Sequence, residues 1–153
     1  MSVDFLPRAE ECTCLAVRQA ARHITQFYDQ FLAPVGLRAT QFSMLARLAR
    51  LGPLTINALA DELVMDRTTL GRNILPLERE GLIRIEPGRD DRRRRELVLT
   101  DSGVKRLRAA THGWKQAQKQ FSARFGEQRT RGLRAMLNEV WTTKLPPASP
   151  SSR

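Results

Sequence analysis

Apolar side chains recur at steps of three and four through most of the chain, a spacing that predicts amphipathic helices. The first such stretch covers residues 11–32, and Pro34 with Gly36 ends it. A second helix is expected over 39–51. Two further helical stretches follow the hairpin described below, at 101–125 and 127–144.

The segment "LTINALADELVMDRTTLGRNILPLEREGLI", which starts at Leu54, predicts two helices joined by a tight turn. Thr55 and Asp66 have side chains that cap helix N-termini, so each is expected to begin one of the two helices. Gly81 fits the position just beyond the last turn of the second helix.

After Gly81 the apolar period changes from helical to alternating. The runs "LIRIE" and "ELVLT", at 82–86 and 96–100, predict two strands, and "PGRDDRRRR" lies between them. A disordered basic tail is rejected for these arginines because an alternating apolar run flanks them on each side. The expected structure is therefore mainly α with a small β-hairpin, and 146–153 is expected to be a disordered tail.

The charge balance changes the picture from fold to function. The 153 residues contain 26 Lys and Arg against 16 Asp and Glu, a net charge of +10. Such a balance points to a polyanionic partner, with nucleic acid ahead of an anionic membrane surface. Hydrophobic residues make up 41% of the chain and aromatic ones 6%, so a core built mostly of aliphatic side chains is expected.

The location expected from the sequence is the cytoplasm. The N-terminus shows no secretory signal pattern, and no apolar run reaches the roughly 18 residues of a membrane span. The two cysteines, Cys12 and Cys14, do not form a disulfide framework, which fits a reducing compartment.

Helix, tight turn, helix and basic hairpin together form the winged helix-turn-helix arrangement. An α-helix fits the major groove of DNA, where base edges can be distinguished, and the second helix of the pair should enter it. Gly71 in that helix lowers its helix propensity, either to allow close backbone approach or to relieve packing. The outward residues of suitable chemistry are Arg67, Thr68, Thr69, Arg72 and Asn73.

The arginines of the hairpin suit the negative potential of a narrow minor groove. Four consecutive arginines, Arg92 to Arg95, cannot all point the same way. We therefore expect one or two to insert into the groove. The others are expected to contact phosphates or to pair with Asp90, Asp91 and Glu96.

These segments resemble the MarR family of winged-helix transcription regulators over roughly 14–145. The most specific part is Asp91-Arg92-Arg93 followed by a strand and "LTDSG", and "GLRATQFSMLARL" is also similar. The resemblance implies Thr68, Thr69, Arg72 and Asn73 as base and phosphate readers. It implies Arg92, Arg93 and Arg94 as wing contacts.

The resemblance also implies a homodimer held by its terminal helices. The implied organisation is a dimerisation helix at 1–36, the DNA-binding domain at 37–100 and dimerisation helices at 101–145, before the tail. Binding to a palindromic double-stranded operator is implied, with repression relieved by a small phenolic or aromatic acid or by oxidation.

Two kinds of sensor are candidates. Cys12 and Cys14 stand at the start of the first helix, and the offset from Cys14 to Tyr28 is similar to the peroxide-sensing branch of the family. Arg18 and Ala39 depart from that branch, and two small residues near a helix start are an equally open reading. No metal site is expected, because two thiols are too few ligands and His23 lies over two turns beyond Cys14.

A ligand pocket is the other option. In the family it lies between the dimer helices and the winged domain, and an arginine or histidine would meet a carboxylate there. Each candidate residue has an alternative interpretation as plain core, interface or surface. The candidates are Arg18, Arg22, His23, Phe27 and Trp114.

An enzyme is not expected. The chain has no metalloprotease motif, phosphate-binding loop or dinucleotide fingerprint, and no cofactor is implied. The competing class is a sequence-independent, architectural nucleic-acid binder, which would share the charge without needing a groove-reading helix tied to a wing.

Overall fold

The computed structural model describes residues 8–147, which divide into two compact units between Ala117 and Gln118. Most of the predicted tail, 148–153, lies outside the described residues. The helices are η1 (Ala9–Glu11), α1 (Thr13–Leu32), η2 (Ala33–Val35), α2 (Ala39–Leu51), α3 (Ile56–Glu62), α4 (Arg67–Arg79), α5 (Asp101–Phe125) and α6 (Glu127–Thr142). The strands are β1 (Leu54–Thr55), β2 (Ile83–Pro87) and β3 (Arg95–Leu99). Among the described residues, no helix is both long and apolar enough to cross a membrane.

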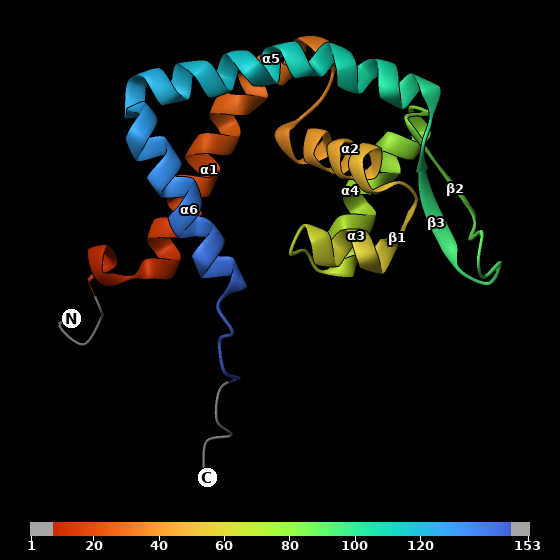
Figure 1. Cartoon of the computed structure of the whole chain (residues 1–153), viewed down its shortest axis with the longest axis horizontal. Helices are drawn as coiled ribbons and strands as arrows, with labels where there is room; N and C mark the ends of the chain where they lie inside the picture. The colour runs from red at the N-terminus through yellow and green to blue at the C-terminus, as the bar shows by residue number, and fades with distance from the viewer. Residues whose placement is uncertain (1–7, 148–153) are drawn as a thin grey trace, which may run out of the picture. The chain divides into compact units, whose positions relative to one another are not determined.

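The sheet has three antiparallel strands in the order β1-β3-β2 (Figure 1). The predicted hairpin of β2 and β3 is confirmed, with Glu86 opposite Glu96. β1 was not predicted, because two residues are too short to show an alternating pattern. It pairs Leu54 with Leu97 and so fixes the start of α3 beside the wing.

The predicted helix boundaries are confirmed by their caps. The Thr55 hydroxyl accepts a hydrogen bond from the Ala58 amide at 3.1 Å. The Asp66 carboxylate accepts one from the Thr69 amide at 2.8 Å. Gly81 follows α4 with a φ of 68°, the left-handed conformation that closes a helix.

The turn between α3 and α4 contains a residue with positive φ that the sequence analysis did not predict. Val64 has a φ of 52°, and its side chain is 70% exposed. A β-branched residue in this region is strained. The Met65 amide donates to the Ala60 carbonyl at 2.9 Å, which holds the turn in this shape.

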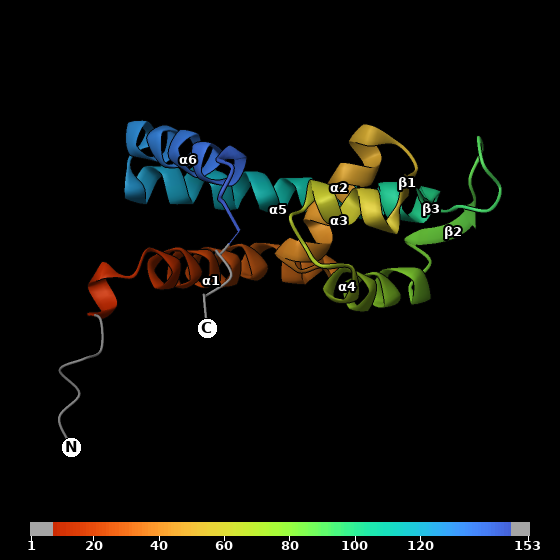
Figure 2. The same ribbon diagram turned by 90° about the horizontal axis from the view of Figure 1, so that it is seen from below.

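The core of the first unit is almost entirely aliphatic, as the composition predicts. It joins α2, α3, α4 and the sheet, which lie beside one another in Figures 1 and 2. Leu70, Ile74 and Leu77 anchor α4 in it, so the opposite face of α4 is left to solvent. The buried members of the core are Leu32, Leu37, Met44, Leu45, Leu48, Leu59, Ala60, Leu70, Ile74, Leu77, Leu82, Ile83, Leu97 and Ala110.

Two glycines let α5 approach its neighbours at backbone distance. A Cβ at Gly103 would lie 2.1 Å from the Leu82 carbonyl oxygen. A Cβ at Gly113 would lie 2.2 Å from the Phe31 carbonyl oxygen. The glycine of the "LTDSG" motif therefore has a packing role at the junction of the wing and α5.

The second unit consists of the end of α5 and α6. Phe121 and Phe125 stack with ring centroids 5.4 Å apart, and the Arg129 guanidinium lies 4.3 Å from the Phe125 ring. Much of the apolar surface of this unit is exposed. Its exposed large apolar residues are Met136, Leu137, Val140, Trp141 and Leu145.

Candidate nucleic-acid interface

The first two turns of α4 present the polar residues that the sequence analysis singled out. Arg67, Thr68, Thr69 and Arg72 are exposed, and Asn73 is half-buried. They stand opposite the buried leucines of the helix, so core packing fixes which face of α4 they occupy. The structure thus leaves four of the five predicted reading residues exposed on α4 and Asn73 partly so.

Two of these side chains also hold the helix itself. The Thr69 hydroxyl donates to Asp66 Oδ2 at 2.5 Å, and Asn73 Nδ2 donates to the Thr69 carbonyl at 2.9 Å. The hydroxyl and then the amide of Thr69 hold the pKa of the Asp66 carboxyl below its ordinary value of 3.8. Because the Thr69 proton is already given to a carboxylate, this hydroxyl is available to a ligand as an acceptor. Asn73 keeps its carbonyl oxygen and a second N–H, which adenine recognition requires.

Gly71 lies in open space. Apart from its chain neighbours and the nearby backbone of its own helix, no heavy atom comes within 4 Å of the position that a Cβ would take. Of the two explanations that the sequence leaves for this glycine, relief of packing within the chain is therefore wrong.

The tip of the wing is built by Asp91. Its carbonyl accepts from the Arg94 amide and its Oδ1 accepts from the Arg93 amide, each at 3.0 Å. Arg94 Nε also lies 3.9 Å from Asp91 Oδ2, so the predicted pairing of an arginine with this acid is found. Gly88 donates its amide to the Arg94 carbonyl at 2.8 Å and closes the loop.

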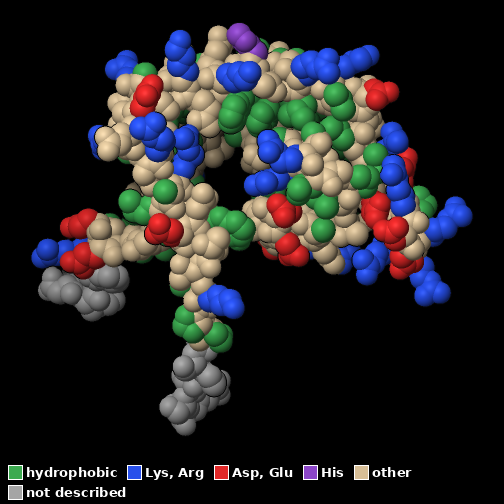
Figure 3. Space-filling model, viewed as in Figure 1, with side chains coloured by type: hydrophobic (Ala, Val, Ile, Leu, Met, Phe, Trp, Pro, Cys, Tyr) green, Lys and Arg blue, Asp and Glu red, His purple; other side chains and the backbone are tan. Residues whose placement is uncertain are grey.

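The wing and the reading helix meet at a common hollow of about 600 Å³. Arg93, Arg94 and Arg95 line it from the wing and Arg67 from α4. Figure 3 shows basic side chains, which in the wing are all arginines, projecting from it with acidic side chains beside them. The start of α3 completes the wall with Thr55, Ile56, Asn57, Ala58 and Asp61. Four guanidinium groups against one carboxylate favour an anion here.

The start of α3 was missed as part of the site from sequence, and Arg95, one of the four arginines considered, was not among the residues named as wing contacts. A signal for Arg95 exists in the alternation of β3, which places it on the same face as the buried Leu97. Arg95 lines the hollow together with Ile56, so this face of β3 looks toward the start of α3. No comparable signal exists for α3, because β1 brings it there.

The candidate sensor residues do not form one cluster. The Cys12 sulfur caps α1 by accepting from the Leu15 amide at 3.4 Å, and Cys14 is exposed, with both thiols free. Arg18, Arg22 and His23 are exposed on α1. No set of three His, Cys, Asp or Glu side chains able to hold a metal ion occurs within 8–147.

The two aromatic candidates have different neighbours. The Phe27 ring meets the Phe31 ring edge to face at 5.1 Å. Trp114 stacks on Phe42 at 6.0 Å, with 17° between the rings. The stacked pair lines a hollow of about 470 Å³ together with α2 arginines that sequence reasoning missed. The remaining lining residues are Ser43, Ala46, Arg47, Arg50 and Thr111.

A buried-core helix pair with an exposed reading face, followed by a three-stranded sheet with a basic hairpin, defines the winged helix-turn-helix class of DNA-binding domains. The model of the MarR family matches residues 37–94. The transcriptional regulator MosR of M. tuberculosis is 35% identical, with 87% of this chain and 97% of that chain covered at a TM-score of 0.74. A structure of MosR in complex with DNA is 34% identical, covering 86% and 99% at a TM-score of 0.69. The chain belongs to the MarR family of helix-turn-helix transcriptional regulators.

Two further relatives are also regulators by name. YwoH of Bacillus subtilis, an uncharacterised HTH-type transcriptional regulator, is 32% identical over 90 residues, which are 59% of this chain and 65% of YwoH. The match thus spans slightly less than two thirds of YwoH. The HTH-type transcriptional regulator PecS of Dickeya dadantii is 28% identical over 120 residues, 76% of this chain and 72% of PecS. The relatives named here are regulators and not enzymes.

Proposed function

We propose that the chain is a repressor that binds a palindromic operator as a homodimer and is released by a small aromatic acid or by oxidation. The observation that carries DNA reading is the hollow shared by Arg67 of α4 and Arg93 to Arg95 of the wing. A phosphate in this hollow would align the exposed face of α4 with the major groove. Phosphate contacts set register and leave sequence to the reading residues.

The hydrogen bonds that the reading residues make within the chain decide which part of the DNA each is assigned to. Arg72 is free to pair with the N7 and O6 of guanine, and Asn73 retains the donor and acceptor that adenine needs. Thr68 suits a phosphate, whereas the Thr69 hydroxyl is given to Asp66. The open space at Gly71 fits a close approach of the helix backbone to DNA.

The arginines of the wing are assigned to two parts of the DNA. Arg93, Arg94 and Arg95 line the hollow and are assigned to phosphate. Arg92 is exposed in the turn that Asp91 opens, at the tip of the hairpin. It is the arginine assigned to the minor groove, where the potential is most negative.

A second copy of the chain is the proposed cover for the exposed apolar side chains of α6. Trp141 is 60% exposed and Met136 62%, and Leu137 and Val140 of the same helix are also exposed. Large exposed apolar patches mark interaction surfaces. A two-fold dimer would place two α4 helices on successive turns of one DNA face.

The release signal has two candidate devices. The hollow of Phe42 and Trp114 offers a flat apolar wall, and Arg47 and Arg50 offer charge for a carboxylate. Oxidation would act instead at Cys12 or Cys14. If peroxide releases DNA from the native protein but not from Cys14→Ser, the release acts through Cys14. If peroxide releases DNA from both proteins, Cys14 is excluded from the mechanism.

Selection of binding sites from random duplex DNA tests the proposal. We expect a two-fold symmetric sequence to be enriched, and it should outcompete random duplex by about a thousandfold or more at physiological salt. Arg72→Gln should flatten the preference for particular bases. Equal affinity for selected and random DNA would instead favour a sequence-independent architectural protein.

A further inference from the structure

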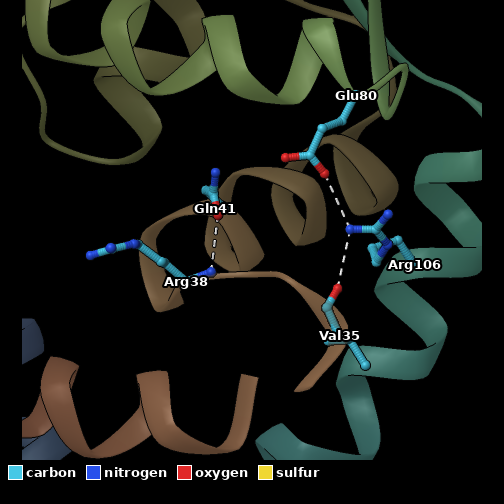
Figure 4. A network of polar contacts seen from close by, with 5 residues as sticks. All are labelled: Val35, Arg38, Gln41, Glu80 and Arg106. Carbon is cyan, nitrogen blue, oxygen red and sulfur yellow. Dashed lines mark hydrogen bonds and ion pairs between the residues drawn. The ribbon is translucent and has the colours of Figure 1, made fainter. Parts of the chain in front are cut away.

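One side chain joins three segments that lie far apart in the sequence. Arg106 of α5 donates from Nη1 to the Val35 carbonyl at 3.1 Å and to Glu80 Oε2 at 3.2 Å (Figure 4). Val35 ends η2, at the junction of α1 and α2, and Glu80 follows the last residue of α4. The same nitrogen therefore connects the recognition helix, the α1–α2 junction and the long helix α5.

Gly36, next to Val35, leaves room for the Arg106 guanidinium. Gly36 has a φ of 72°, and a Cβ there would lie 3.2 Å from Nη1 of Arg106. Both the backbone conformation and the guanidinium therefore favour glycine at this position. Arg106 is 34% and Glu80 44% exposed in their side chains, so the ion pair itself adds little to the stability of the fold.

The C-terminal end of α4 has a second attachment beside the first. The Thr100 hydroxyl donates to the Gly81 carbonyl at 2.6 Å, and the Thr100 amide donates to the Leu82 carbonyl at 3.1 Å. Thr100 thus holds Gly81 and Leu82, just beyond the end of α4, and Arg106 adds a contact through Glu80. Both attachments are at the end of α4 opposite to its reading residues.

Because α4 is held at its C-terminal end, a small tilt of the helix there displaces the reading residues near its N-terminal end. The base reader Arg72 lies about 12 Å along the helix from Glu80, so a tilt of about 5° at Glu80 displaces it by about 1 Å. Hydrogen bonds to base edges do not tolerate such a displacement. The direction of α4 therefore matters more for base reading than the energy of the ion pair matters for folding.

We propose that Arg106 is a positioning residue for DNA recognition, which sets the direction of α4 through Glu80 and the Val35 carbonyl without touching DNA. The proposal rests on the proposed reading of DNA by α4. It assigns to α5 a role in sequence preference, in addition to the role of the polar face of α4.

The test compares Arg106→Gln and Glu80→Gln with Arg108→Gln as the matched control. Arg108 is exposed on the same helix, and its replacement removes the same charge. The probes are a duplex enriched by the native protein from a random pool and a random duplex of equal length. For Arg106→Gln we expect affinity for the enriched duplex to fall about fivefold to tenfold. Affinity for random duplex and the salt dependence should match the control.

The double variant of Arg106→Gln and Glu80→Gln supports the proposal if it is no weaker than Arg106→Gln alone, because the two residues act through one contact. A shallower salt dependence for Arg106→Gln than for Arg108→Gln would instead show a phosphate contact and overturn the proposal. A large fall in melting temperature with unchanged preference would also overturn it, since the role would then be structural alone.

Amide hydrogen exchange without DNA separates this proposal from the proposed function. Arg106→Gln should speed exchange at 78–82 and 35–37 relative to Arg108→Gln, because the ends that it joins become looser. Unchanged exchange there overturns the positioning role even if operator reading stands. If selection enriches no duplex, the proposed function fails, and faster exchange still supports the contact as the attachment of α4.

Discussion

The winged part of the molecule and the C-terminal unit differ in how far they bury their apolar side chains. Residues of α2, α3, α4 and the sheet share one core, in which Leu45, Leu59 and Leu97 are 0% exposed. In α6, whose residues are all described, Thr130 is the only buried one, while Trp141 is 60% exposed. The first region buries its apolar side chains within this chain, with Leu32 of α1 and Ala110 of α5 completing the core, whereas the second has an apolar surface that suits a partner.

Matched glycines give the strongest way to test this difference. Gly103→Ala would push a methyl group to 2.1 Å from the Leu82 carbonyl oxygen, which backbone packing holds in place. We expect Gly103→Ala to lower the free energy of unfolding by about 3 kcal/mol. At Gly132 in α6 nothing lies within 4 Å of the added carbon, so Gly132→Ala should raise it by up to about 1 kcal/mol.

Urea unfolding at a fixed protein concentration measures both changes. Similar small effects of the two substitutions would contradict the tight junction between the wing and α5. A large loss of stability in Gly132→Ala would show instead that α6 is closely covered at that position by another chain.

The exposed apolar face of α6 yields the second prediction. If a second copy covers Trp141, Trp141→Ala should weaken the dimer by about 2 kcal/mol, roughly thirtyfold in its dissociation constant. Sedimentation equilibrium measures the constant, and Leu51→Ala serves as a control, since Leu51 is an exposed leucine of the winged part at 46%. An unchanged constant in Trp141→Ala would exclude this face from the interface.

Local signals predicted the helices and the wing because these depend on neighbours in sequence. Thr55 and Asp66 cap the helices that they were expected to begin, and Gly81 closes α4. β1 escaped prediction because its two residues become a strand through pairing with β3. Val64 escaped for a related reason, since the close joining of two helices and not its own preference sets its conformation.

The sequence predicted the residues of the candidate site but not the contacts between them that depend on the fold. Residue type and helical period were enough to place Arg67 and Arg72 on the exposed face of α4. They could not show that Arg95 would join Arg67 in one hollow, because that contact depends on the register of the sheet. They also could not connect Trp114 with Arg50, which come together through the packing of α5 on α2.

Within the winged part itself, the turn at Val64 is a weak point that can be improved. Its φ of 52° disfavours a β-branched side chain, and at 70% exposure the side chain has little packing to lose. Val64→Gly should therefore raise the free energy of unfolding by about 1 kcal/mol. A loss of stability in urea unfolding would show that the Val64 side chain makes a contact that outweighs the backbone strain.

The smallest expected effect is at the start of the reading helix. Hydrogen bonds from Thr69 lower the pKa of Asp66, so the carboxylate stabilises the folded state above its ordinary pKa of 3.8. This contribution is lost as the pH falls through the lower pKa of the folded state. Asp66→Asn can still accept from the Thr69 amide but does not ionise, which makes it the matched control.

The quantity that isolates Asp66 is the difference in unfolding free energy between the native chain and Asp66→Asn. Every other carboxyl titrates in both proteins, and its contribution cancels from this difference. The native chain should be the more stable at neutral pH, and its advantage should shrink as the pH falls through 3.8 and then through the lower pKa of the folded state. A difference that does not change with pH would mean that Asp66 gains nothing from its charge. Its cap would then resemble that of Thr55, which holds α3 by a neutral hydroxyl.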